Sequence, residues 1–411
     1  MNGSWCGNRC ADTYTVELEE EQGKERYDVK KFRFTALPAN YTVYNSWLEL
    51  DTTVIELFFK TNSPHFQTSN RQIRRRRIKK PSSATFFVFG DDFADNRNLP
   101  LTDPVTEMSR QWAYPYGSNY VDADGFPRPN TPSSRFSNYK IQSDFIATML
   151  GLEEAPPAHA RTAEKTCDLS GMTFATGGAM VLDSTSHEFP TFTKQVDIFR
   201  KMVKDGTITE KQLTHSVALV AFSGNDYAST GVIGLSSPSD INAYIGKVTK
   251  EMAANVEQLL KLGVTKVLVN NLHPVSCTPS QTRTNNYTTC DIFENLGVSI
   301  HNNNLKQVMT AKKNVHIADL YTTFINIVDN VPGKGSDLTK QFKRKLSPCC
   351  ESLDSKGYCG QQGELSRELL YTVCDKSNKF FYWDDMHPMH VGWEAAMKQL
   401  EKPLRVFLDQ D

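Results

Sequence analysis

The chain has 411 residues, of which 39% are hydrophobic and 23% charged, so a large folded core is expected and global disorder is excluded. It carries 46 Lys and Arg against 47 Asp and Glu, and this formal net charge of -1 excludes a surface built throughout for nucleic acid. No apolar run reaches the roughly 18 residues that a transmembrane helix needs, so we expect no membrane span.

The first 83 residues are predicted to form a separate N-terminal extension. Residues 1–80 hold 14 Lys and Arg against 10 Asp and Glu, and a basic run, Arg74–Arg77 followed by Lys79 and Lys80, closes this stretch. Such a run is typical of a nuclear signal, of an anionic-surface contact or of a solvated linker, and we favour the linker. Strand-like composition at 41–44 and 52–59 predicts partial order, with the rest disordered.

From residue 84 onward, continuous apolar runs indicate strands that are buried on both faces. Each run ends at Gly, Ser, Asn or Asp, which is typical of the point where a strand enters a loop. The four runs are 85–89, 217–222, 266–269 and 315–318.

Amphipathic patterns between these runs predict helices. The first pattern covers 192–203 and stops at Gly206, and the second covers 241–259 and stops at Gly263. Apolar strands that alternate with such helices predict an α/β fold whose parallel sheet is covered on both sides. Ligands of these folds bind beyond the carboxyl ends of the strands, where the polar clusters of this chain lie.

Four polar clusters carry the candidate chemistry. Taken alone, each reads as a turn or a helix cap, and only their order and their places at predicted strand ends favour a functional site. They are Gly90–Asn98, Thr173–Ala179, Ser223–Tyr227 and Tyr382–Pro388.

Individual residues in these clusters have side chains suited to acyl transfer. Asp384 and His387 are three apart, so the carboxylate can hold the imidazole Nδ1–H and leave Nε2 to act as a base. The amide of Asn225 can donate to a developing oxyanion. The paired Gly177 and Gly178 let backbone N–H groups approach a ligand closely.

Taken together, the motifs identify a family. The stretches that match its sequence blocks are Phe87–Asp91, Phe174–Ala179, Gly224–Tyr227, Leu272–Pro279 and Trp383–Pro388, with 112–117 and 134–137 in the connecting region. In this order they resemble the plant GDSL esterase/lipases of the SGNH hydrolase superfamily. The resemblance covers residues 84–408. It implies a three-layer α/β/α sandwich with a central parallel sheet of about five strands, similar to flavodoxin, in one domain over 84–411.

The resemblance also implies a site and an activity. In that family the residue after Gly-Asp is a nucleophilic Ser, the His of the last block is the base, and the Asp three residues earlier orients it. The matching residues here are His387 and Asp384, with Gly177 (or Gly178) and Asn225 as oxyanion donors. The implied substrate is a carboxylic ester of a carbohydrate or lipid. Neither a cofactor or metal nor a nucleic-acid partner is expected, and a monomer is expected.

The nucleophile itself is absent, because position 92 is Asp. A carboxylate that attacks an ester gives a mixed anhydride, a much poorer route than a seryl ester. The fixed charge of Asp92 is also predicted to compete for the oxyanion donors and to raise the pKa of His387, which weakens the base. Two further positions depart from the family pattern. Arg97 and Ser223 each stand where Gly is usual, and Arg97 is a candidate partner for Asp92 or Asp95.

Three hypotheses therefore stay open. The first is an ester hydrolase of the family's class, with Asp92 as a base for water. The second is a catalytically inactive member whose cleft binds an acylated ligand. The third, which rests on residues 71–80 alone, is a protein that binds an anionic partner through its basic arm.

The signals for cellular compartment conflict. Nine cysteines, most of them in turn-rich segments of the second half, favour disulfides and an oxidising compartment. The triplets at Asn40 and Asn286 fit the N-glycosylation pattern. The family would carry a short secretory signal, but Glu19–Glu21 stand where an apolar stretch would be needed, so no such signal is expected in residues 1–30. Extracellular localisation is nevertheless the expectation.

Overall fold

The computed structural model describes residues 84–119, 134–162, 166–182, 189–229, 237–291, 294–328, 340–364 and 366–410. It also gives the backbone of two short antiparallel strands, β1 (Leu18–Glu20) and β2 (Tyr27–Val29). The chain divides into two compact units, Met1–Arg77 and Ile78–Asp411. The strand-like stretches at 41–44 and 52–59 and the basic run lie outside the described residues.

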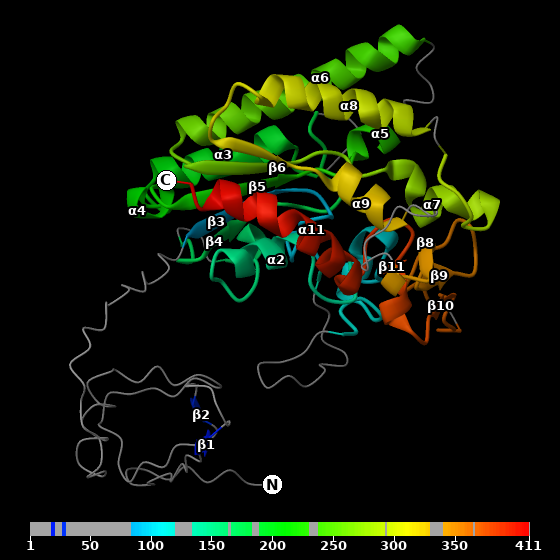
Figure 1. Ribbon diagram of the computed structural model, residues 1–411. Helices are drawn as coiled ribbons and strands as arrows, with labels where there is room; N and C mark the ends of the chain where they lie inside the picture. Colours follow the sequence, from blue (N-terminus) through cyan, green and yellow to red (C-terminus); the bar gives the residue numbers. More distant parts are fainter. Residues whose placement is uncertain are drawn as a thin grey trace. The chain divides into compact units, whose positions relative to one another are not determined.

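A five-stranded parallel sheet forms the centre of the second unit (Figure 1). Its strand order is β4-β3-β5-β6-β7, and every neighbouring pair is parallel. The four strands predicted from apolar runs are confirmed, whereas β4 is only three residues long and begins with Gly, so no apolar run reveals it. The strands are β3 (Thr85–Gly90), β4 (Gly171–Thr173), β5 (Ser216–Ala221), β6 (Lys266–Asn270) and β7 (Val315–Ala318).

The sheet separates two hydrophobic cores, as the three-layer prediction requires. Side chains alternate along β3, so Phe86 and Val88 join one core while Phe87 and Phe89 join the other. The first core is closed by α2 (Gln142–Met149), α9 (Leu320–Val328) and α11 (His390–Leu408). The second is closed by α3 (Phe192–Lys204), α6 (Pro238–Lys261) and α8 (Glu294–Met309), the last two side by side in Figure 1.

The two predicted helices are confirmed as α3 and α6, although α6 begins at Pro238, before the predicted pattern. Thr191 caps α3 through its side-chain oxygen, and Ser237 caps α6, with Pro238 in the first turn. Gly206 and Gly263 follow the helix ends with φ of +79° and +104°. A residue with a side chain would be strained at these angles, so glycine ends each helix.

Disulfides tie together the loops around the carboxyl ends of the strands. The bonded pairs are Cys277–Cys290, Cys349–Cys374 and Cys350–Cys359. Cys167 is a free thiol, whereas Cys6 and Cys10 lie outside the described residues. The prediction of disulfides is therefore confirmed for six cysteines. The last two disulfides belong to or pack against a third apolar cluster, which also contains Leu99, Tyr116, Phe136 and Trp383.

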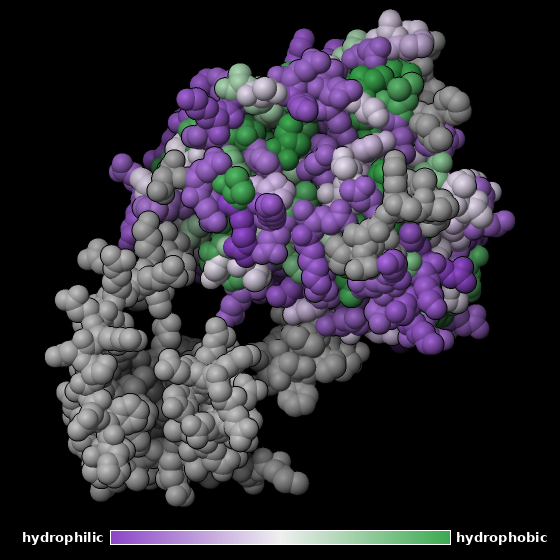
Figure 2. Space-filling model, in the orientation of Figure 1, coloured by the Kyte–Doolittle hydropathy of each residue, from purple (hydrophilic) through white to green (hydrophobic). Residues whose placement is uncertain are grey.

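Smaller elements complete the unit. Strand β8 (Arg344–Pro348) pairs in parallel with β11 (Phe380–Tyr382), and β9 (Cys350–Ser352) pairs antiparallel with β10 (Tyr371–Val373). The short helices are α4 (Glu210–Leu213), α5 (Asn225–Ser229) and α7 (Pro279–Thr282). Among the described helices, none has the length and apolar character to cross a bilayer. Polar residues cover most of the coloured face in Figure 2.

Candidate active site

Asp92 stands directly beyond the end of β3, on a turn that only glycine permits. Gly90 has φ of +149°, and a Cβ on it would lie 2.1 Å from the carbonyl oxygen of Ala221 on β5. The N–H of Asp91 donates to that same oxygen at 3.1 Å. The close approach of the two strands therefore sets the direction in which the chain leaves the sheet, and Asp92 follows at the sheet edge.

His387 reaches Asp92 from the far end of the sequence. It lies in the loop between β11 and α11, where Asp384 Oδ1 accepts the backbone N–H of His387 at 2.8 Å. Both carboxylate oxygens of Asp384 lie 2.9 Å from the imidazole Nδ1. The opposite ring atom, Nε2, lies 2.7 Å from Asp92 Oδ2, across 295 residues of sequence. The imidazole is thus clamped between two carboxylates.

This clamp stabilises the charged imidazolium. A carboxylate only accepts hydrogen bonds, so an imidazole between two of them satisfies both when each ring nitrogen carries a proton. Burial disfavours the charge, but Asp384 and Asp92 outweigh burial and raise the pKa of His387 to about 10. Burial likewise disfavours the Asp92 carboxylate, yet the hydrogen bond and charge of His387 lower the pKa of Asp92 to about 2.

Asn225 begins α5 just beyond β5 and brings its amide to the same point. Its Nδ2 donates to Asp92 Oδ1 at 3.0 Å and lies 3.1 Å from the carbonyl oxygen of Ala179. Gly224, with φ of +117°, makes the turn that places it there. The amide that would stabilise an oxyanion is therefore occupied by the Asp92 side chain itself.

The two candidate glycines differ in what they offer. The N–H of Gly177, the first of the two expected oxyanion donors, donates to Asp95 Oδ2 at 2.8 Å. Asp95 also accepts the N–H groups of Arg97, Asn98 and Leu99, and it thereby fastens the loop after β3 to the glycine pair. For Gly178, whose φ is +73°, no hydrogen bond from its N–H is found within the described residues. The expected role of either glycine as an oxyanion donor stays a prediction.

Behind Asp384 lies a support that sequence reasoning missed. The Tyr116 hydroxyl donates to Asp384 Oδ2 at 2.6 Å and accepts from Arg110 Nε at 2.8 Å. The guanidinium of Arg110 also lies 3.6 Å from Asp384 and 3.5 Å from Asp385. Tyr116 lies in the connecting region and Arg110 lies just before it. Both are far in sequence from the last block, so no sequence spacing could reveal their contacts with Asp384.

Aromatic rings enclose the imidazole on its faces. Phe136 stacks on His387 with ring centroids 4.8 Å apart, and Phe93 lies at 5.9 Å. His273, in the loop after β6, packs on Phe93 at 4.8 Å and is buried. Burial lowers the pKa of His273 to about 4, so it adds no positive charge to the site near neutral pH. The surroundings of His387 are therefore aromatic rings and anionic carboxylates.

The two positions that depart from the family pattern have different consequences. Ser223 fits its place, because its N–H and hydroxyl both donate to Asp91 Oδ2, at 2.6 and 2.7 Å. Arg97 has φ of +132°, in the region that favours glycine. Its Nε donates to Ser134 at 2.9 Å and its backbone N–H donates to Asp95. Of the two candidate partners, Asp95 is thus bound by the backbone N–H of Arg97, while the guanidinium binds a hydroxyl.

Replacing Arg97 by Gly is expected to raise the free energy of unfolding by about 1 kcal/mol, because a strained φ costs about 1–3 kcal/mol and the lost bond to Ser134 offsets part of the gain. Urea denaturation measures the difference. Arg97→Ala is the matched control, since it loses the same hydrogen bond but keeps the strained angle. A Gly variant no more stable than the Ala variant would contradict the strain argument.

Within the described ranges, no cluster of three or more His, Cys, Asp or Glu side chains is arranged to hold a metal ion. What the arrangement does contain is an Asp-His pair, an amide donor and a glycine pair, all at the carboxyl ends of β3, β5 and the neighbouring strand β4. By residue type these groups match the site that the sequence resemblance implies, in which Asp92 stands at the position expected for the nucleophile.

Comparison with known proteins agrees with this class. The family model of GDSL-like lipase/acylhydrolases matches residues 66–400, so the chain belongs to that family. It is 33% identical over 332 residues to GDSL esterase/lipase At5g03610 of Arabidopsis thaliana, covering 78% of this chain and 87% of the relative. GDSL esterase/lipase At3g09930 of the same plant is 30% identical over 369 residues, with 87% and 99% covered. GDSL esterase/lipase At5g03600, also from Arabidopsis, is 33% identical over 353 residues, with 83% and 98% covered.

Proposed function

We propose that this protein is a carboxylic ester hydrolase whose turnover is suppressed at neutral pH by Asp92. Membership of the family supports ester hydrolysis as the general activity. The observation that supports suppressed turnover is the 2.7 Å contact between Asp92 Oδ2 and His387 Nε2. It leaves no space for a water molecule between the two side chains, and it keeps on the imidazole the proton that a base must lose.

The proposed residual route uses water. With the pKa of His387 at about 10, roughly one molecule in a thousand has a neutral imidazole at pH 7. In that form, and with Asp92 turned aside, Nε2 takes a proton from water while the water oxygen bonds to the ester carbonyl carbon. The oxyanion accepts from Asn225 and from the Gly178 N–H. The imidazolium then returns its proton to the departing alcohol as the ester bond breaks.

A direct chemical role for Asp92 is less favourable. Its pKa of about 2 makes it a weak base for water. As a nucleophile it would form a mixed anhydride, and its oxygens already accept from His387 and Asn225. We therefore propose that Asp92 takes no part in the bond-making steps. Its side chain instead blocks the site by binding His387 and Asn225.

The contacts of Asp92 with His387 and Asn225 also favour a second candidate function. Because Asp92 engages both the base and the amide donor, the surroundings of Asp92 are proposed as the binding site of an acylated carbohydrate or lipid that is held without being cleaved. The basic arm at 71–80 lies outside the described residues, so its binding of an anionic partner stays a prediction.

Replacing His387 by Gln or Ala tests the hydrolase proposal. We expect slow hydrolysis of short p-nitrophenyl esters by the wild type and a loss of at least about tenfold in either variant, because general-base catalysis contributes about 10²–10⁴-fold. The same substitutions at His215, an exposed histidine, are the matched control, because they remove a histidine from the surface. Hydrolysis unchanged in both His387 variants would place the activity elsewhere, and a wild type that binds acyl ligands with no turnover would favour the second function.

We also propose an extracellular location and a single domain over 84–411 after an N-terminal extension of 83 residues. The three disulfides support an oxidising compartment. Asn286, the potential glycosylation site in the described part, is exposed in a turn with φ of +58°. A glycan at such a position would not disturb the core.

A further inference from the structure

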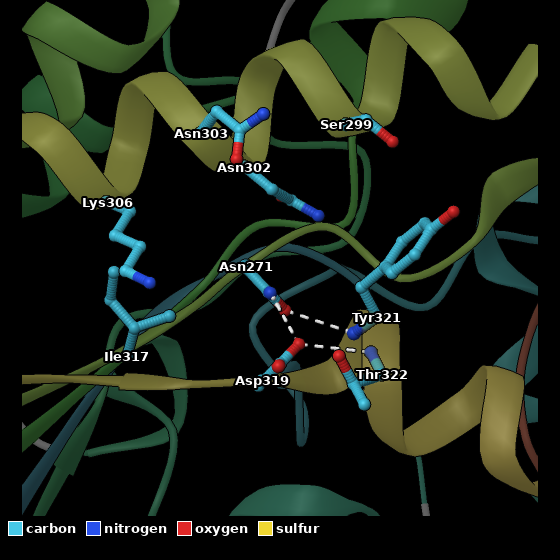
Figure 3. A pocket seen from close by; sticks show the side chains of 9 residues that line it. All are labelled: Asn271, Ser299, Asn302, Asn303, Lys306, Ile317, Asp319, Tyr321 and Thr322. Atoms are coloured by element: carbon cyan, nitrogen blue, oxygen red, sulfur yellow. Dashed lines mark hydrogen bonds between the residues drawn. The ribbon is translucent and has the colours of Figure 1, made fainter.

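A polar cavity of about 480 Å³ lies at the carboxyl ends of β6 and β7 (Figure 3), and its lining residues differ from the candidate catalytic residues. Its walls come from α8 on one side and from the start of α9 on the other, with β7 along the base. The lining residues are Asn271, Ser299, Asn302, Asn303, Lys306, Ile317, Asp319, Tyr321 and Thr322. This volume lies within the roughly 300–1,000 Å³ that small-molecule sites occupy.

The floor of the cavity is held by a closed set of hydrogen bonds. Asn271 Nδ2 donates to Asp319 Oδ1 at 2.8 Å, and the same oxygen accepts the N–H of Thr322 at 3.0 Å. Asn271 Oδ1 accepts the N–H of Tyr321 at 3.1 Å. Asn302 bonds to both the N–H and the carbonyl oxygen of Leu272, which fixes α8 against the chain after β6. The cavity is therefore a built feature with positioned walls.

Other polar groups on the walls are left for a ligand. In Figure 3 the Lys306 chain extends from α8 toward the cavity, and the Tyr321 ring rises from α9 on the opposite side. Within the described part of the chain, no hydrogen bond or ion pair is found for the side chains of Asn303, Lys306 and Tyr321. The cavity thus offers an amide, an ammonium and a phenol, with the apolar faces of Tyr321 and Ile317 beside them.

We propose that this cavity binds a neutral carbohydrate. Asparagine amides and hydroxyl groups both donate and accept, and so do the hydroxyls of a sugar. One cation, Lys306, and one carboxylate, Asp319, make the lining neutral, which disfavours a phosphate or another polyanion. The faces of Tyr321 and Ile317 suit the C–H surface of a pyranose ring.

The cavity adjoins the candidate active site. Adjacent strands lie about 4.8 Å apart, and one to three strand spacings separate β6 and β7 from β5 and β3, so the ends of these strands are roughly 5–15 Å apart. Two short connections join the sites. Asn271 is two residues before His273, which packs on Phe93 next to Asp92. His301, beside Asn302 on α8, bonds to the hydroxyl of Tyr227 at 2.6 Å. That the bound sugar is part of an ester substrate rests on the proposed function, whereas sugar binding itself does not.

Binding of methyl β-D-glucopyranoside, methyl β-D-galactopyranoside and methyl β-D-xylopyranoside to the full chain tests the inference, with inorganic phosphate as the anionic alternative. We expect saturation-transfer NMR to detect at least one glycoside and calorimetry to give its Kd. The double variant Asn303→Ala, Lys306→Met is expected to weaken that Kd about tenfold or more, since two hydrogen bonds are lost. Lys250→Met, an exposed position on α6 outside the lining, is the matched control and is expected to leave the Kd unchanged.

Three results would overturn the inference. These are a wild type that binds none of the glycosides, a double variant that binds them as well as Lys250→Met does, and phosphate that binds more tightly than every glycoside. Because binding is measured in place of turnover, absence of ester hydrolysis does not affect the outcome. Tyr321→Ala, which keeps the backbone N–H that caps the floor, is a second variant if the double variant fails to fold.

Discussion

Replacing Asp92 by Ser is expected to raise kcat/KM for short p-nitrophenyl esters by about 10³-fold or more. Three changes act together. The variant gains a hydroxyl that forms a seryl ester, it removes the charge that keeps His387 protonated, and it frees the Asn225 amide for the oxyanion. In subtilisin, an unrelated serine hydrolase, removing the nucleophile costs about 2 × 10⁶ in kcat, so a thousandfold gain is a moderate expectation for a site that was not selected with Ser.

Asp92→Asn is the matched control for this gain. Asn is nearly isosteric with Asp and removes the charge, but it supplies no nucleophile. A gain of similar size in Asp92→Asn would mean that relief of the charge, and not the new hydroxyl, causes the increase. The double variant Asp92→Ser, His387→Ala is expected to return to wild-type rates or below. An Asp92→Ser rate equal to that of the wild type would contradict the view that position 92 limits turnover.

The pKa of His387 is expected to be about 10 in the wild type and to fall substantially in Asp92→Ser. Burial acts to lower this pKa, while Asp384 and Asp92 raise it, and the variant removes one of the two carboxylates. NMR titration of the imidazole carbon shifts measures both values directly. The residual ester hydrolysis of the wild type is correspondingly expected to increase up to about pH 10, whereas that of Asp92→Ser levels off at lower pH.

The same pair makes stability depend on pH in a defined direction. The raised pKa of His387 means that its contribution to the free energy of unfolding is fully present below about 6.5 and is lost as pH rises toward about 10. The lowered pKa of Asp92 means that its contribution is present above 3.8 and is lost as pH falls toward about 2. Because the two groups stabilise one contact, that contact contributes most between about pH 4 and 6.5. A titrating imidazole with an ordinary pKa and no alkaline loss of stability would contradict the clamp.

Much of the sheet was predictable from the sequence because its strands are buried on both faces. The runs at β3, β5, β6 and β7 stand out, since successive residues of such a strand point to opposite faces and most of them are apolar. Strand β4 has only three residues, one of them Gly171, and this segment is a strand because it pairs with β3. Its assignment therefore depends on a distant neighbour in the chain, Phe86, which pairs with Gly171 in the register.

The sequence by itself determined the family, four of the five strands of the sheet and the candidate residues Asp92, Asn225, Asp384 and His387, because the family's motifs keep fixed residue types in a fixed order at strand ends. Only the tertiary structure decided what these side chains do to one another. It placed the imidazole between two carboxylates, directed the Gly177 N–H to Asp95, and set Tyr116 and Arg110 behind Asp384. These are contacts between segments that are distant in sequence. Their geometry depends on how packed layers bring loops together, and no local pattern of residues encodes a distance across the sheet.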